Sequence, residues 1–119
     1  MALGGNATFT NTIDQGRRIF NIANGGKIIV TDLGLVTAAS VIVTGAITLD
    51  STDFRRMGLS KMLGILHASG WTSAPAFVPL TALWDGKTNK IMLYDLLGAA
   101  LTAAAIGNGG TIRMSVLGM

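Results

Sequence analysis

The sequence has no cysteine and no glutamate, and its single histidine is His67. The absence of cysteine excludes disulfides, thiolate metal sites and a cysteine nucleophile. A transition-metal site needs two or more histidine or carboxylate ligands at matched spacing, and no aspartate lies within ten residues of His67. The sequence therefore predicts no metal site and no cofactor, and we interpret His67 as a loop or partly buried residue.

Residue patterns that support catalysis are also missing. Asp50 and Asp53 could form a carboxylate pair, but two aspartates separated by Ser-Thr are typical of a capped helical turn. Ser51 and Ser60 have no candidate base, and the sequence contains no GxSxG motif. The Gly-Lys-Thr at 86–88 lacks the earlier glycine of a phosphate-binding loop. We therefore expect a protein that is not an enzyme and has no small-molecule substrate.

Charged residues are scarce, at 13% of the sequence, with a net charge of +3. An average soluble domain has roughly 25% charged residues. The small excess of basic residues is weak evidence for nucleic-acid binding. Because 50% of the residues are hydrophobic, we expect the chain to bury part of its surface against other subunits.

The same shortage of charge allows a membrane protein as an alternative. Three segments, 33–49, 62–84 and 96–112, contain no charged residue, and the second is long enough to span a bilayer as a helix. Two glycines and both prolines of the chain interrupt this segment, and its centre is polar, which argues against such a helix. The first residues, MALGGN, have no basic region and no long apolar core, so we predict no signal peptide.

Threonine, isoleucine and valine number 13, 11 and 6, and there are 16 glycines. Branched residues fit a pleated sheet, and glycine permits the tight turns between strands. Eight short segments have strand character: 7–13, 17–23, 27–31, 41–49, 62–66, 78–84, 90–94 and 111–117. We predict one all-β domain over residues 1–119, a jelly-roll-like antiparallel β-sandwich of about seven or eight strands. Residues 1–8 are predicted to be a flexible N-terminal arm.

The turns between these segments are predicted from local residue chemistry. Asp50 and Asp53 are expected to cap a helical turn at 54–57, which Gly58 ends in a left-handed conformation. Hairpin turns are predicted at 24–26 and 85–89, a strand end at 32–34 and a loop at 67–75. The alanine-rich segment 96–106 is predicted to be either a helix or a mobile loop.

Three motifs follow one another in the order Gln15-Gly16-Arg17-Arg18, Gly45-Ala46-Ile47-Thr48-Leu49-Asp50-Ser51 and Gly58-Leu59-Ser60. In this order, with a turn at 85–89 and a closing strand near 111–117, the sequence resembles a family of small structural proteins of tailed bacteriophages. These are head decoration, or cement, proteins encoded beside the capsid gene. The resemblance implies a virion protein that is made in the host cytoplasm and binds the major capsid protein on the capsid surface. It also implies a symmetric homo-oligomer, which we expect to be a trimer.

The candidate interface residues are Arg17, Arg18, Phe54, Arg55, Arg56 and Trp71. Arginine forms bidentate bonds to carboxylates and is enriched in protein interfaces, although a solvated face would also explain the two arginine pairs. Trp71 lies in a predicted loop, where a tryptophan can anchor an interface. Two other functions stay open: a small membrane-associated, lysis-related phage protein, and a basic nucleic-acid-binding β-barrel whose affinity would fall with salt.

Overall fold

The computed structural model describes residues 3–11 and 18–119, and this part of the chain contains nine strands and three α-helices. The strands are β1 (Ala7–Thr10), β2 (Ile19–Asn21), β3 (Lys27–Leu35), β4 (Ala46–Thr48), β5 (Met62–Trp71), β6 (Phe77–Val78), β7 (Thr81–Asp85), β8 (Lys90–Tyr94) and β9 (Thr111–Gly118). The helices are α1 (Ala38–Val41), α2 (Ser51–Met57) and α3 (Ala103–Ile106), with 3-10 turns η1 (Gly4–Asn6) and η2 (Ala23–Gly25). Strands with isolated bridges make up 46% of the described residues, and α-helices with 3-10 turns make up 19%, which confirms the all-β prediction. The strands number nine instead of seven or eight.

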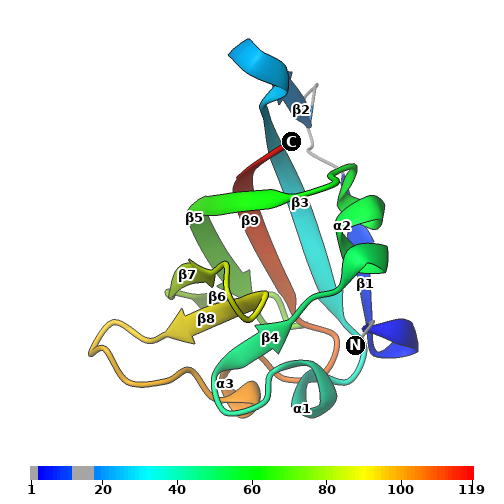
Figure 1. Cartoon of the computed structure of the whole chain (residues 1–119). Coiled ribbons are helices and arrows are strands. Elements are labelled where there is room, and N and C mark those ends of the chain that lie inside the picture. The colour runs from blue at the N-terminus through cyan, green and yellow to red at the C-terminus, as the bar shows by residue number, and fades with distance from the viewer. Residues whose placement is uncertain (1–2, 12–17) are drawn as a thin grey trace.

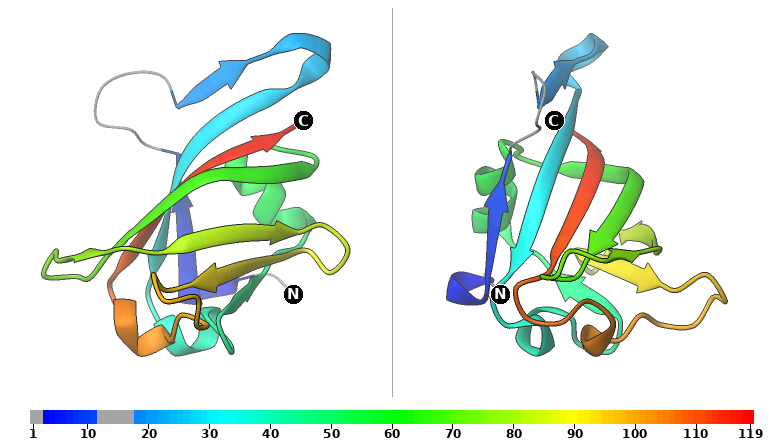
Figure 2. Two further views of the ribbon diagram at one scale, coloured as in Figure 1. Left: turned by 90° about the vertical axis from the view of Figure 1, so that its left-hand side faces the viewer. Right: turned by 180° about the vertical axis from the view of Figure 1, so that it is seen from behind.

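The strands form two antiparallel sheets that pack as a sandwich. The larger sheet has the order β1-β3-β9-β5-β6, and β2 pairs with the same edge of β3 as β1 does. The smaller sheet has the order β4-β8-β7. Figure 1 shows the smaller sheet in front of one face of the larger sheet. Figure 2 shows that the turn between β2 and β3 stands out from the rest of the molecule.

The core lies between the two sheets, on one face of β3 and β9. The inward residues of β9 are Ile112, Met114 and Val116, and all three are fully buried, as the alternation of this segment predicted. On β3 the inward residues include Ile29 and Leu33, which are also fully buried. The opposite face of these two central strands is mixed, with the polar side chains of Asp32, Arg113 and Ser115 beside the apolar side chains of Ile28, Val30 and Leu117. Neither the smaller sheet nor a helix covers that outer face in Figure 2.

The strand predicted over 41–49 is wrong in its first half. Residues 38–41 form α1, and Val43 and Ala46 close a two-residue turn by exchanging backbone hydrogen bonds of 2.9 and 3.0 Å. The turn residues Thr44 and Gly45 have positive φ angles of 51° and 75°, as this tight hairpin turn requires. Only Ala46–Thr48 is a strand. Val41 of α1 and Ile47 of β4 are both buried in the core, whereas Val43 between them is exposed, so the apolar alternation was not that of one strand.

Two segments that were predicted to end or interrupt a strand belong to paired strands instead. The strand end predicted at 32–34 is wrong because Asp32 faces Arg113 on β9 and forms two hydrogen bonds with its guanidinium, at 2.7 and 3.0 Å. The loop predicted at 67–75 is wrong for residues 67–71, which continue β5 because β9 pairs with that strand over its whole length. His67 is therefore an exposed strand residue. The segment predicted as one strand over 78–84 is divided into β6 and β7.

The first described residues are packed against the body of the protein. Leu3 and Ala7 are buried, and the Leu3 N–H donates a hydrogen bond to Asp53 Oδ1 at 3.3 Å. Residues 3–8 of the predicted flexible arm are thus anchored, while residues 1–2 lie outside the described part. The segment 96–106 is helical only at Ala103–Ile106, so of its two predicted alternatives the helix holds for this last turn and a loop for residues 96–102.

Candidate functional site

Asp50 and Asp53 form the N-terminal cap of α2, as predicted. The Asp50 side chain accepts hydrogen bonds from the N–H groups of Thr52 and Asp53, at 2.9 and 3.1 Å. Asp53 Oδ2 accepts the Asp50 N–H at 2.9 Å, which completes a reciprocal capping box. Burial raises the pKa of Asp53, although the N–H groups of Asp50 and Leu3 oppose that rise. Both carboxylates are used by backbone N–H groups, so this pair serves the fold.

Two of the candidate arginines lie at the other end of α2. Arg55 and Arg56 are exposed in its last turn, and Gly58 ends the helix with φ of 86°, as predicted. The Lys27 ammonium donates a hydrogen bond to the Gly58 carbonyl at 3.4 Å, which brings a third cation to this end. We call Lys27, Arg55 and Arg56 the basic end. Cations beside a helix C-terminus are also favoured by its dipole, so their position has a structural reason as well.

The other candidates around α2 do not share this surface. Phe54 is partly buried and packs edge-on against Trp84, with ring centroids 6.0 Å apart, so its ring faces the core. Arg18 is exposed next to β2, and its carbonyl accepts the Val30 N–H at 2.8 Å. Arg17 lies outside the described residues. The structure therefore brings Arg55 and Arg56 together with Lys27 and separates them from Phe54.

A rigid turn after β8 holds two leucines in solvent. Asp95 Oδ1 accepts hydrogen bonds from the N–H groups of Leu97 and Ala99, at 2.9 and 3.0 Å. Two backbone bonds between Asp95 and the residues Gly98 and Ala99 close the same turn. Leu96 is 72% exposed and Leu97 is 94% exposed. We call Asp95–Ala99 the leucine turn. The sequence predicted a helix or a mobile loop over 96–106 and did not identify this turn.

Exposed apolar side chains are also common elsewhere on the surface. The large hydrophobic residues that are exposed among the described residues are Phe20, Ile22, Val36, Val43, Leu63, Leu66, Phe77, Leu83, Leu96, Leu97 and Met119. Single exposed apolar residues are normal, whereas Leu96 and Leu97 are adjacent on one hydrogen-bonded turn, which makes this turn a candidate contact surface.

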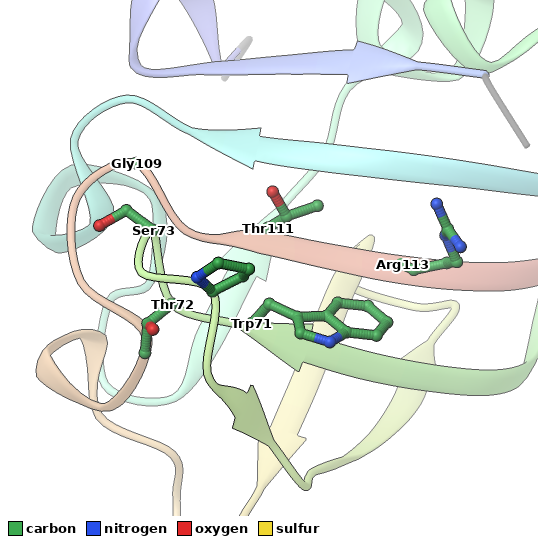
Figure 3. Close-up of a pocket in the computed structure, with 7 residues that line it drawn as sticks. Trp71, Thr72, Ser73, Gly109, Thr111 and Arg113 are labelled. Atoms are coloured by element: carbon green, nitrogen blue, oxygen red, sulfur yellow. The ribbon is translucent and has the colours of Figure 1, made fainter. Parts of the chain in front are cut away.

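Trp71 lies at the end of β5, beside a pocket on the outer face of the larger sheet (Figure 3). The pocket has a volume of about 420 Å³ and is lined by Trp71, Thr72, Ser73, Pro75, Gly109, Thr111 and Arg113. We call it the tryptophan pocket. The Arg113 guanidinium carbon lies 5.8 Å from the centre of the indole, within the range of a cation–π contact. The Phe77 ring lies 5.9 Å from the indole.

Two loops meet closely at this pocket, and glycine permits their approach. A Cβ atom at Gly109 would lie 3.2 Å from Ser73 Cβ, and one at Gly110 would lie 2.8 Å from the Trp71 carbonyl oxygen. The loop after β5 is held by Thr72, whose N–H donates to the Ala76 carbonyl and whose hydroxyl accepts the Ala76 N–H. The pocket walls are therefore fixed by backbone packing.

The candidate residues from the sequence do not gather into one site. Trp71 pairs with Thr111 at one end of the larger sheet, whereas Lys27 of the basic end pairs with Gly118 at the opposite end. Within the described ranges there is no group of three histidine or aspartate residues that could hold a metal ion. No helix in the described part is both long and apolar enough to cross a membrane.

The chain was compared with protein-family models, with curated proteins and with solved structures, and it matched none of them.

Proposed function

We propose that this chain is a non-enzymatic structural protein of a tailed-bacteriophage virion, a decoration or cement protein that binds the capsid surface as a homotrimer. The capsid role is supported by the three sequence motifs that resemble such proteins. The observation that carries the assembly role is the leucine turn, because it presents Leu96 and Leu97 to solvent on a fixed backbone.

The physical argument for subunit contact rests on desolvation. Burying one leucine side chain from an exposed state contributes about 1.5–3 kcal/mol, and each subunit offers two on one turn. Because Asp95 already holds the backbone of the turn, little conformational entropy is lost when the leucines are buried. A closed ring of subunits repeats this contact at every interface.

The basic end offers a second, separate contact. Figure 1 shows the loop after β8 on one side of the molecule and α2 on the other. Arg55 and Arg56 are therefore available for carboxylates of the shell while the leucine turn packs between subunits. Modest contacts of this kind multiply through avidity once an oligomer presents several copies together.

Native mass spectrometry of the purified chain tests the oligomer. The expected mass is three times the 12.3 kDa of one chain, about 37 kDa. The double variant Leu96→Ser/Leu97→Ser should be a monomer with an unchanged circular dichroism spectrum. Leu83→Ser is the matched control, since Leu83 is also exposed but lies on β7, and it should stay a trimer. A monomeric parent, or a trimeric double variant, would contradict the proposed subunit contact.

Attachment to capsids tests the second contact. Heads prepared without the protein should bind the parent chain less tightly as salt rises, because charge pairs at the rim are screened. Arg55→Ala/Arg56→Ala should bind more weakly at low salt and show a flatter salt dependence, with its folding nearly intact. Lys87→Ala, in the exposed turn between β7 and β8, is the control for lost charge. If the parent and the double variant bound equally at every salt concentration, the two arginines would have no role in capsid attachment and would be only solvent-exposed residues at the end of α2.

A further inference from the structure

Three hydroxyl groups line the tryptophan pocket, those of Thr72, Ser73 and Thr111. Among the described residues, neither the Ser73 nor the Thr111 hydroxyl takes part in a hydrogen bond, although both line the pocket. The Thr72 hydroxyl accepts one hydrogen bond and keeps its proton available to a ligand. A hydroxyl both donates and accepts, so this wall matches a ligand whose polar groups also do both.

The charges at the pocket cancel one another. Arg113 is the charged residue of the lining, and Asp32 neutralises it through bonds from Nε at 2.7 Å and from Nη2 at 3.0 Å. A bidentate pair of this kind also fixes the plane of the guanidinium. The pocket therefore gives no net attraction to an anion, and a phosphate backbone would find no uncompensated cation among its lining residues.

The apolar part of the lining is an aromatic ring beside a proline. Trp71 and Pro75 provide a flat, apolar surface next to the hydroxyl wall. The pocket volume of about 420 Å³ falls in the range of small-molecule sites, about 300–1,000 Å³. Paired strands and close loop contacts form the walls, so little reorganisation is needed on binding.

From these features we infer that the tryptophan pocket binds a neutral saccharide. One sugar ring stacks its C–H face on the Trp71 indole, and its hydroxyl groups bond to Ser73, Thr111 and Arg113. An extended peptide fits less well, because peptides add to open strand edges. The edge of β5 at Trp71 is already paired with β6, through Gly70 with Val78 and Trp71 with Phe77.

Saccharide binding at this pocket is independent of the proposed capsid role. Saccharide binding is measured on the purified chain without capsids, so failure of one proposal leaves the other untouched.

The two tryptophans of the sequence give a direct assay. The Trp84→Phe variant retains Trp71 as its single tryptophan, and the Trp71→Phe variant retains Trp84. Each variant is titrated with neutral oligosaccharides of glucose, mannose, galactose and N-acetylglucosamine while tryptophan emission is recorded. At least one saccharide should change the emission of Trp84→Phe saturably, and the same saccharide should leave the emission of Trp71→Phe unchanged.

Variants that each lack one hydroxyl group test whether Ser73 and Thr111 contact the sugar. In the Trp84→Phe background, Ser73→Ala and Thr111→Val should each weaken binding about fivefold, the effect of one net hydrogen bond. Thr81→Val, which removes an exposed hydroxyl on β7, should change nothing. The proposal is overturned if no saccharide of the panel binds at millimolar concentration. It is also overturned if a proline-rich peptide or single-stranded DNA titrates Trp71 where saccharides do not, or if neither hydroxyl variant weakens binding.

Discussion

Replacing Asp53 by alanine should destabilise the protein more than the same change at any other aspartate in the described ranges 3–11 and 18–119. The Asp53 side chain is fully buried and accepts the N–H groups of Asp50 and Leu3, at 2.9 and 3.3 Å. Leaving a buried donor without an acceptor costs about 1–3 kcal/mol, and here one donor is buried and the other partly buried. The alanine variant no longer buries a carboxylate, and the desolvation penalty that is removed offsets part of this loss of stability. We expect a net loss of about 2–3 kcal/mol.

Thermal unfolding followed by circular dichroism measures this effect. A chain of this size loses about 4 °C of Tm for each kcal/mol, so the Asp53→Ala variant should melt about 8–12 °C lower. Asp53→Asn should melt between parent and alanine variant, because its amide oxygen still accepts one N–H. Asp85→Ala is the matched control, since it also removes an acceptor of two hydrogen bonds, but the Lys87 N–H and the Thr88 hydroxyl that it loses are exposed and can turn to water.

The pH dependence gives a second test of the same reasoning. Burial raises the pKa of Asp53 above its ordinary value of 3.8, so the folded protein takes up the proton before the unfolded chain does. The contribution of Asp53 to stability therefore increases as the pH falls from neutral to about 3.8 and is constant below it. The difference in unfolding free energy between parent and Asp53→Ala should widen over this range. A variant that melts within 2 °C of the parent, or a difference that narrows, would refute the account.

The remaining predictions concern a loop glycine, the ion pair and the secondary structure. Gly110→Ala should lower the Tm by about 4–12 °C, because the added Cβ would press on Ile106 and the Trp71 carbonyl, whereas Gly64→Ala, with open space around it, should leave the Tm unchanged. Asp32→Asn should cost about 1 kcal/mol in urea denaturation, since the Arg113 pair is only partly exposed; no loss would mean that solvent replaces the pair fully. Far-ultraviolet circular dichroism should give a helix content below about a third, and a higher value would contradict the all-β fold.

The parts of the fold that the sequence predicted are those with local causes. Asp50 and Asp53 cap a helix whose end lies at Gly58, so every residue of that signal lies within nine positions. Strand β8 and the alternation of β9 were also predicted, because a turn or a period of two identifies them locally. The errors at 32–34 and 67–71 have a distant cause. Asp32 looked like a turn residue, and its partner Arg113 lies 81 positions away.

The residues of the candidate site also include some that could be selected from the sequence and some that only the fold brings together. Trp71 and the arginine pair at 55–56 were selected because tryptophan and arginine are common in interfaces, which depends on residue type alone. The partners of Trp71, namely Ser73, Thr111 and Arg113, come partly from a strand some 40 positions later. No spacing motif joins them. The leucine turn had a local signal, Asp95 followed by two leucines and Gly98, but the alanines after it left a helix and a loop as equal alternatives for 96–106.

The position of β9 in the larger sheet determines the order in which this protein can fold. Strand β9 lies between β3 and β5, which do not pair with each other, although it follows both in the chain. While a ribosome is still making residues 111–118, β3 and β5 each present an unpaired edge, a surface that promotes aggregation. Contacts of such sequence separation also slow folding, because a long loop must close before they form. A nascent chain without β9 would lack Thr111 and Arg113, so the tryptophan pocket forms only after the last strand has inserted.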